Sequence, residues 1–459
     1  MSVGQQFFKV DSLSIKNFEK LEILSVLLKA EIFTRLLFIS FKLKKYFKLL
    51  VNKPNYDKIS YEVLKKNIQY CINSRKFIDN LIFYSFDKYR TVEIDDAISF
   101  RRIDEGYEIF VAVADLSEIW NIHMDKFVFE FPQSLYTLDG KYYMLPINFI
   151  KELSLLKNQK RTVFLFRFLF NKDFELKKND FQPCIISVKE NLSYNKACKI
   201  VKENDYLEKI SKNLLLRRLS KGAIVLSDNK GMKLIIQELM ILVNYVTAKL
   251  LQQNNFGFIS RVFELPKDFD SYKGKVYNDN SIIKFKILSM LSFARYEVGC
   301  YPHELLGLDI YLHITSPIRR YVDVVNQKQL LSLYYSCDEF FNKNELREIL
   351  KTLNPILQKY NNLAKEYNKK LAIVKFIKYL LNSPKEYFEF NYFVNNEDLF
   401  IIPKRISQEV KIGEFKKLKN KVNKESVICF KKLEIVDLLY NYLRRVNLSS
   451  GNEKQEKLK

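Results

Sequence analysis

The sequence predicts a protein of mixed helices and strands, of the α/β (α+β) class, divided into several domains. Apolar residues recur at helical spacing in the first 76 residues, and short alternating strands then dominate up to about residue 190. Helical periodicity returns between residues 194 and 382, and short strands follow. With 459 residues, of which 47% are hydrophobic, the chain is long enough to bury a large core.

Residues 1–76 are expected to form a basic helical region, with apolar positions three and four apart from Leu21 to Val51 and a break at "NKPN". The apolar run "EIFTRLLFISFKLKKYFKLL" is broken by basic residues, among them Arg35, Lys42, Lys44 and Lys45, and is therefore a poor membrane span. We expect a packed helix and no membrane partner. A basic helix lying on RNA or on a membrane surface is the alternative.

Residues 77–382 are expected to form the catalytic domain. "AISFRRIDEGYEIFVAVADLS" predicts a β-hairpin that turns at Asp104-Glu105-Gly106. Helices are expected at 194–255, around 284–300 and from Ser316 to 382. Residues 383–449, including "ESVICFKKLEIVDLL", predict short strands of a small OB-like β-barrel, and residues 450–459 a disordered tail.

The net charge of +23 indicates a polyanionic partner, most often nucleic acid, although a composition bias toward lysine would also produce it. The six cysteines are scattered, with no Cys-x-x-Cys pair. This spacing suggests neither a disulfide framework nor a zinc site and is typical of buried free thiols in a reducing compartment. Together with the absence of a recognisable signal peptide, it predicts a cytoplasmic protein.

"YSFDKYRTVEIDDAISF" gathers four carboxylates within ten residues: Asp87, Glu93, Asp95 and Asp96. In an extended segment Glu93 and Asp95 share one face, and a bend is needed to bring Asp96 to the same point. Carboxylates held this close repel one another unless a cation lies between them, and oxygen ligands suit Mg²⁺ or Mn²⁺. A solvated acidic turn is the alternative interpretation.

A second stretch, "YLHITSPIRRYVD", predicts a helix with Ser316 as N-cap and Pro317 at its first position. Arg319 and Arg320 then lie in the first turn, where a helix end and two guanidinium groups suit a phosphate. Together with the carboxylates, this stretch indicates metal-assisted hydrolysis of a phosphodiester.

Six motifs in order resemble the catalytic domain of the ribonuclease II / ribonuclease R (RNB) family of exoribonucleases, from about Arg75 to Lys378. They are "FYSFDKYRTVEIDDAI", "VAVADLS", "YYMLPINFIKELSLLKNQKR", "LIIQELMILVN", "RVFELP" and "HELLGLDIYLHITSPIRRYVD". The resemblance implies an α/β domain with a deep channel that takes the 3′ end of single-stranded RNA. It also implies hydrolysis from that end, with release of nucleoside 5′-monophosphates, by a chain that we expect to be a monomer.

Carried over by position, Asp87, Glu93, Asp95 and Asp96 form the metal site, with Asp87 and Asp96 as the direct ligands. The resemblance implies that Asp95 orients the attacking water and that Arg319 stabilises the transition state. Glu93 is the other catalytic acid that it implies. Tyr136 and Tyr194 fall where the family places tyrosines against the terminal bases. Arg320 is the remaining candidate for RNA binding.

Four positions depart from the family pattern. Glu93 replaces an Asp, Gln327 a His, Leu226 the Phe of the base clamp, and Lys365 a Glu near the end of the domain. Residues 1–76 are also too few for the two cold-shock barrels usual in the family, and the basic helices are candidates for their role. These departures favour the alternative of a non-catalytic or weakly active RNA-binding relative. A structural or membrane-surface protein is the third hypothesis.

Overall fold

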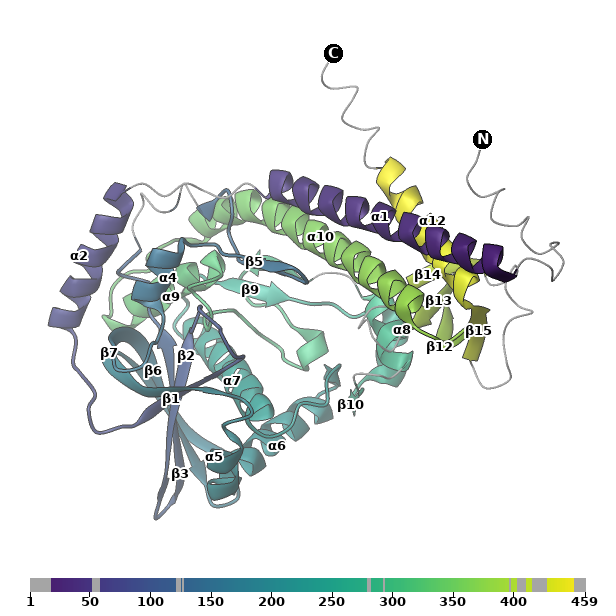
Figure 1. The fold of residues 1–459 in the computed structure, drawn as a ribbon. Coiled ribbons are helices and arrows are strands. Elements are labelled where there is room, and N and C mark those ends of the chain that lie inside the picture. The colour runs from purple at the N-terminus through teal and green to yellow at the C-terminus, as the bar shows by residue number, and fades with distance from the viewer. Residues whose placement is uncertain are drawn as a thin grey trace. The chain divides into compact units, whose positions relative to one another are not determined.

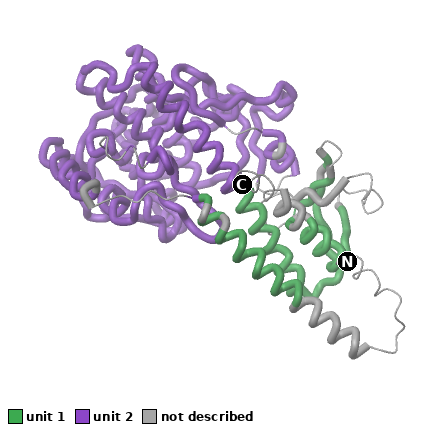
Figure 2. Tube along the Cα trace, turned by 90° about the horizontal axis from the view of Figure 1, so that it is seen from above, with its two compact units in different colours: residues 1–50, 366–459 green, residues 51–365 purple. Residues whose placement is uncertain are grey.

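The computed structural model describes residues 18–51, 58–120, 125, 128–278, 282–291, 294–395, 398–402, 410–414 and 427–449. Two compact units make up the chain: residues 51–365, and residues 1–50 together with 366–459 (Figure 2). The domain boundaries expected at 76, 382 and 449 stay predictions. The "NKPN" break and the tail at 450–459 lie outside the described residues.

The larger unit is built on a closed β-barrel in the strand order β1-β2-β3-β6-β7 (Figure 1). Its strands are β1 (Phe83–Asp87), β2 (Asp96–Ile103), β3 (Gly106–Ala114), β6 (Lys160–Asn171) and β7 (Leu176–Ser193). Neighbouring strands are antiparallel except for β1 and β7, which close the barrel in parallel. The β2–β3 hairpin confirms the predicted turn. Gly106 is needed there because an added Cβ would lie 2.0 Å from the Phe170 carbonyl oxygen.

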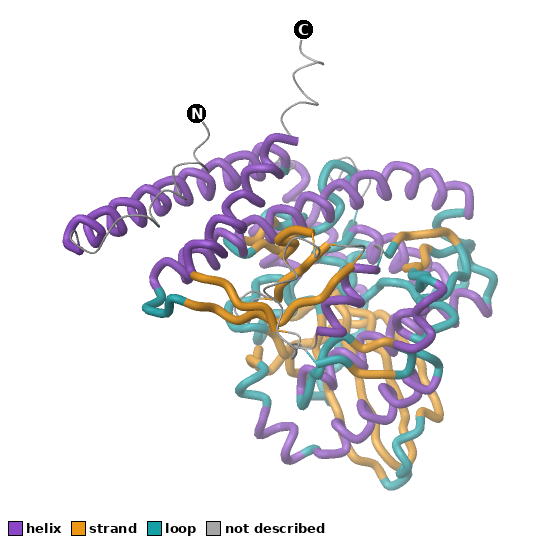
Figure 3. The backbone as a smooth tube through the Cα atoms, turned by 90° about the vertical axis from the view of Figure 1, so that its right-hand side faces the viewer, coloured by secondary structure: helices purple, strands orange, loops and turns teal. Residues whose placement is uncertain are grey.

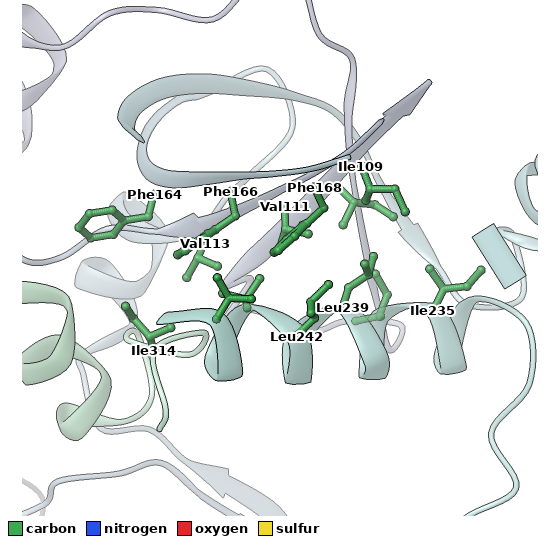
Figure 4. Packing of buried hydrophobic residues seen from close by; sticks show 14 of the residues in the cluster. Ile109, Val111, Val113, Phe164, Phe166, Phe168, Ile235, Leu239, Leu242 and Ile314 are labelled. Atoms are coloured by element: carbon green, nitrogen blue, oxygen red, sulfur yellow. The ribbon is translucent and has the colours of Figure 1, made fainter. Parts of the chain in front are cut away.

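Helix α7 (Met232–Gln253) packs against this barrel and forms the main core (Figure 4). Alternate residues of a strand share a face, so β3 and β6 each present a row of apolar side chains to the helix. The facing residues are Ile109, Val111, Val113, Phe164, Phe166 and Phe168 from the strands, and Ile235, Leu239 and Leu242 from α7. Among the described helices only α7 is long and apolar enough to cross a membrane, but 67% of its most apolar stretch is buried in the protein. It is therefore a core helix.

The remaining elements of this unit surround the barrel. The helices are α2 (Lys58–Ser74), α4 (Ile147–Leu153), α5 (Cys198–Glu203), α6 (Asp205–Ser220), α8 (Ile282–Met290), α9 (Tyr321–Tyr334) and the start of α10 (Lys343–Asn382). Short 3-10 turns occupy Lys267–Tyr272 and Glu304–Leu306. Three two-stranded pairs complete it: β4 (Leu135–Thr137) with β5 (Gly140–Tyr142), β8 (Ile224–Val225) with β10 (Lys275–Val276), and β9 (Ile259–Val262) with β11 (Arg295–Val298).

Two helix predictions in this unit need correction. The expected helix around 284–300 ends at Met290, and β11 follows it. The helix expected from Pro317 begins only at Tyr321. The backbone N–H of Ser316 donates to the Asp323 carboxylate, and the backbone N–H of Ile318 donates to the Asp95 carboxylate. These two hydrogen bonds hold the stretch as a turn. Ser316 is therefore not an N-cap.

The smaller unit contains α1 (Phe18–Leu50), the end of α10, and a four-stranded antiparallel sheet in the order β14-β13-β12-β15. The strands are β12 (Tyr387–Asn395), β13 (Asp398–Ile402), β14 (Val410–Glu414) and β15 (Val427–Lys431). Helix α1 runs beside α10, as the labels of Figure 1 and the paired helices of Figure 3 show. Phe47 of α1 stacks on Tyr367 of α10, with 4.3 Å between the ring centroids. Helices α1 and α2 agree with the helices predicted for residues 1–76, as far as the structure describes that region.

The OB-like barrel expected at 383–449 is not confirmed, because the described strands form an open sheet. The strand prediction past Lys431 is wrong: α12 (Lys432–Ser449) begins there. Its apolar residues Ile435, Val436, Leu439 and Leu443 recur at helical spacing and are buried in the core of this unit. The apolar run "VICF" forms β15, and the strand ends one residue later, at Lys431.

Candidate active site

The four acidic residues meet at one rim of the barrel. Tyr84 pairs with Ile98, so Asp87 at the end of β1 lies opposite the start of β2, which is Asp96. The segment between them is irregular, not the extended strand that the sequence predicts, and Glu93, Ile94 and Asp95 are all buried. Such an irregular segment is free of the two-residue alternation, so consecutive acids can turn toward the same side.

The turn after α4 holds the acidic segment in place. The Ser154 hydroxyl donates to the Val92 carbonyl at 2.8 Å and accepts from the Ile94 N–H at 3.3 Å. The Leu155 N–H donates to the Ile94 carbonyl at 3.0 Å. These bonds replace the ladder that a strand would have supplied to the buried backbone. The stretch "KELSLL" therefore positions the acids, although none of its own residues carries a charge into the site.

Asp95 connects the acidic segment, residues 87–96, to the turn that contains Ile318, Arg319 and Arg320, the arginine turn. One carboxylate oxygen accepts from the Ile318 N–H at 3.0 Å, and the other from Nε of Arg319 at 3.2 Å. Burial raises the pKa of Asp95 to about 7, against the opposing pull of Arg319. Nearby carboxylates, Asp95 foremost, raise the pKa of Arg319 although burial acts the other way, so the guanidinium stays charged. Its side chain is 36% exposed and can still face a ligand.

Glu93 is held by two hydroxyl groups from one side of the site. Tyr136 donates its phenol to one carboxylate oxygen at 2.6 Å, and Ser134 donates its hydroxyl to the other. The Ser134 hydroxyl also accepts from the Met144 N–H, and its own N–H donates to the Arg319 carbonyl. Burial raises the pKa of Glu93 despite these bonds. The extra methylene of Glu93 thus reaches the β4–β5 hairpin.

Asp87 and Asp96 form the other half of the cluster. Within the described part of the chain, no hydrogen bond or ion pair engages either carboxylate. Burial raises the pKa of Asp87 to about 6, and burial together with the charges of Asp87 and Asp95 raises that of Asp96 well above its usual range. Two adjacent carboxylates lacking protein partners are the first requirement of a divalent-cation site.

The donor set fits Mg²⁺ in a particular way. Mg²⁺ is commonly bound by one or two carboxylates, its remaining positions being taken by water and substrate phosphate. Asp87 and Asp96 meet that requirement, while the oxygens of Glu93 and Asp95 already accept protein hydrogen bonds. Among the described residues no group of three or more His, Cys, Asp or Glu side chains is arranged to hold a metal.

Tyr194 lies beside the unengaged acids. Asp87 pairs with Ser193 at the end of β7, so Tyr194 follows immediately beyond it. Burial, then Asp87 and Asp96, raise the pKa of Tyr194 to about 12, and the Lys233 ammonium lies 5.8 Å from its ring centroid. Arg320 instead turns inward: its Nη2 donates to buried Asp323 at 2.8 Å, and its side chain is only 19% exposed. It braces the arginine turn.

Two of the departures from the family pattern have structural roles. Gln327 is fully buried, donates to the Ala114 carbonyl at 2.7 Å and accepts from the Leu116 N–H at 3.0 Å, so it ties α9 to the end of β3. Leu226 packs in a small apolar cluster with Ile224 and Phe269. The sequence did not single out Ser134, which lies just before the β4–β5 hairpin, or Lys141, which lies on it. The Asp139-Gly140 turn signal in "YTLDGKY" could have revealed the pairing of Tyr136 with Lys141.

The motifs in which the sequence resembles the RNB family thus meet in the structure, where acids at the rim of a closed barrel contact an arginine from more than 200 residues away. Comparison with known families agrees. The RNB domain matches residues 75–336, more than half of the chain, and the chain belongs to the RNB domain family.

The relatives with established names are distant. Ribonuclease R of Mycoplasma genitalium is 24% identical over 387 residues, which cover 68% of this chain and 53% of the relative. Ribonuclease R of Aquifex aeolicus is 24% identical over 328 residues, covering 56% of this chain and 46% of the relative. The chain thus spans about half the length of the curated relatives it matches.

Solved structures show the same fold. The apo form of Mycoplasma genitalium RNase R superposes with a TM-score of 0.67 at 20% identity, covering 81% of this chain and 69% of that one. Yeast Ssd1, described as a pseudonuclease, superposes with a TM-score of 0.61 at 15% identity, covering 79% and 52% of the two chains. Proteins with this fold therefore include ribonucleases and a pseudonuclease.

Proposed function

We propose that this chain is a 3′→5′ exoribonuclease that hydrolyses single-stranded RNA to nucleoside 5′-monophosphates with the help of a divalent metal ion. The observation that carries the proposal is the arrangement of Asp87 and Asp96, which no hydrogen bond or ion pair engages among the described residues, next to the Asp95–Arg319 ion pair. Structures of the Mycoplasma genitalium relative in complex with single-stranded and with double-stranded RNA support RNA as the substrate class.

Each residue has a chemical task in this proposal. Asp87 and Asp96 hold Mg²⁺ or Mn²⁺, which when bound supplies an activated water and neutralises charge on the phosphate. Asp95, fixed by Ile318 and Arg319, orients the attacking water through its carboxylate. Arg319 donates to the phosphate oxygens as negative charge builds up on them, an effect worth about 3–4 kcal/mol in comparable sites.

Two aromatic side chains complete the site. Tyr136 is 44% exposed, with its hydroxyl anchored on Glu93, so its ring is available to a terminal base. Tyr194 borders the Asp87–Asp96 pair. Base stacking on such rings contributes about 1–3 kcal/mol per base and tolerates any sequence. The six cysteines are all free thiols, which supports the further proposal of a cytoplasmic location, and we also propose that the chain is a monomer.

The second candidate is an RNA-binding relative that lacks efficient chemistry. Glu93 favours it, because its oxygens are engaged by Ser134 and Tyr136, and so does the likeness to Ssd1. The intact Asp87, Asp95, Asp96 and Arg319 favour the enzyme.

One assay separates the two candidates. Single-stranded RNA labelled at the 3′ or at the 5′ end is incubated with the chain and Mg²⁺, beside Asp95→Asn. Asp104→Asn, at the exposed tip of the β2–β3 hairpin, is the matched control. We expect the 5′-labelled RNA to shorten stepwise with wild type and Asp104→Asn but not with Asp95→Asn. RNA that is bound by the wild type yet never shortened would establish the non-catalytic relative.

A further inference from the structure

The β4–β5 hairpin places a lysine beside the tyrosine that reaches the acids. Tyr136 and Lys141 are directly paired across the antiparallel strands. Directly opposed residues extend to the same face, with Cβ atoms about 5 Å apart. The Tyr136 hydroxyl donates to Glu93, so this face is the one turned toward the acidic segment. Lys141 therefore projects on the active-site side of the hairpin.

The charge of the Lys141 ammonium acts on the acids, but the ammonium is not paired with any of them in the described part of the chain. Lys141 is exposed, and in the described part of the chain no hydrogen bond or ion pair engages it. Its charge nevertheless reaches the cluster: burial raises the pKa of Asp87 and of Glu93, and Lys141 acts in the opposite direction on both. Arg319 differs, because its Nε is already bonded to Asp95.

An acidic site must overcome its own repulsion to admit a polyanion. Four carboxylates lie at this rim, and one internal cation, Arg319, is paired with one of them. A phosphate that approaches from solvent needs a further positive charge on the outer side. An aromatic ring and an ammonium on one short hairpin match the two parts of a nucleotide, since the base stacks and the phosphate pairs with a cation.

We propose that Lys141 binds the RNA phosphate next to the base that stacks on Tyr136, so that the hairpin grips one nucleotide. This inference rests on the proposed function, because it takes RNA as the ligand. Lys141 is a binding residue, and it has no task in the bond-breaking step. Its loss should therefore weaken RNA binding and raise KM while kcat stays close to the wild-type value.

The test is RNA affinity as a function of salt. A 5′-fluorescein-labelled single-stranded RNA is titrated with the full chain in EDTA, which prevents cleavage, and anisotropy gives Kd. For Lys141→Gln we expect Kd to rise about threefold to tenfold at low salt, and the slope of log Kd against log salt to fall by about 0.7. Lys141→Arg should keep both values, and Lys141→Glu should bind more weakly than Lys141→Gln.

Lys172→Gln is the matched control. Lys172 is exposed in the β6–β7 turn and follows Asn171. Asn171 pairs with Gly106, the first residue of β3, at the opposite end of that strand from the acids. Its removal should leave the salt slope unchanged, and thermal unfolding of every variant should match the wild type. An unchanged slope in Lys141→Gln would overturn this inference alone. RNA binding that responds to Lys141 without any hydrolysis would overturn the proposed catalysis alone, and no RNA binding by the wild type would overturn both.

Discussion

The two ends of the β2–β3 hairpin each contain a carboxylate, buried at the turn end and half-buried at the rim end, and their surroundings differ in charge. At the turn end, Glu108 is 2% exposed and accepts hydrogen bonds from Arg101 and Arg167. Burial would raise its pKa, but the bonds from Arg167 and Arg101 outweigh it and lower the pKa. At the rim end, Asp96 meets other acids in place of arginines, and its pKa is raised well above the usual range.

The difference separates a structural acid from one that we propose to be functional. A buried charge that contributes to stability is matched by partners, as Glu108 is. A cluster of acids left without such partners costs stability, and a fold retains it where a ligand or a reaction needs the charge. The same barrel thus shows what its acids look like when they serve packing alone, and the following predictions use that internal reference.

The largest expected effect comes from removing an arginine at each end. Arg319→Gln should lower kcat about 10²- to 10³-fold, because the developing charge on the phosphate loses its donor. Arg167→Gln, the matched change at the turn end, should leave kcat within about twofold and lower the free energy of unfolding by about 1 kcal/mol. RNA degradation rates and thermal unfolding of both variants check the pair. Equal losses of activity in the two variants would remove the distinction between the ends.

A smaller effect is expected on stability when each acid is made neutral. Glu108→Gln should lower the free energy of unfolding by about 1–2 kcal/mol, since two half-exposed arginines lose a common partner. Asp96→Asn should leave stability unchanged or raise it in metal-free buffer, because it removes repulsion from Asp87 and Asp95. Chemical denaturation of both variants near neutral pH measures the two signs. A loss of stability in Asp96→Asn as large as that in Glu108→Gln would contradict the comparison.

The smallest and most selective effect is on pH dependence. Because the pKa of Asp87 is raised from 3.8 to about 6, the folded chain holds a proton that the unfolded chain has released between these pH values. The contribution of Asp87 to stability therefore falls as pH rises through this range, whereas the lowered pKa of Glu108 adds stability that is lost as pH falls.

Thermal unfolding of metal-free wild type and Asp87→Asn from about pH 4 to about pH 7 isolates this contribution. The stability of the wild type relative to the variant should decline as pH rises, and Mg²⁺ should restore it near neutral pH only in the wild type. Parallel curves, with no response to Mg²⁺, would show that the pKa of Asp87 is not raised, and a relative stability that rises with pH would show that Asp87 is compensated in the manner of Glu108. Protons and the cation are expected to compete for the same carboxylates.

Local patterns in the sequence were sufficient for much of the fold. The hairpin at Asp104–Gly106 followed from alternation around a turn, and the helical N-terminal region from apolar spacing, because both depend on neighbours a few residues apart. The acidic motif and the arginine motif also predicted two segments that the structure brings into contact, and the roles of their residues stay predictions. Alternation misled where a strand passed directly into a helix, as at Lys432, since four apolar residues suit either structure.

Only the tertiary structure decided which of the four acids have hydrogen-bond partners. Asp95 is paired with an arginine 224 positions away, and Glu93 with hydroxyls of Ser134 and Tyr136 some 40 positions away. The same long-range bonds delay the start of α9 and turn Lys141 toward the site. The sequence by itself determined which charged groups exist and roughly where the chain bends. Burial and partners determine the state of each charge, and these arise only when distant segments meet in a low-dielectric interior.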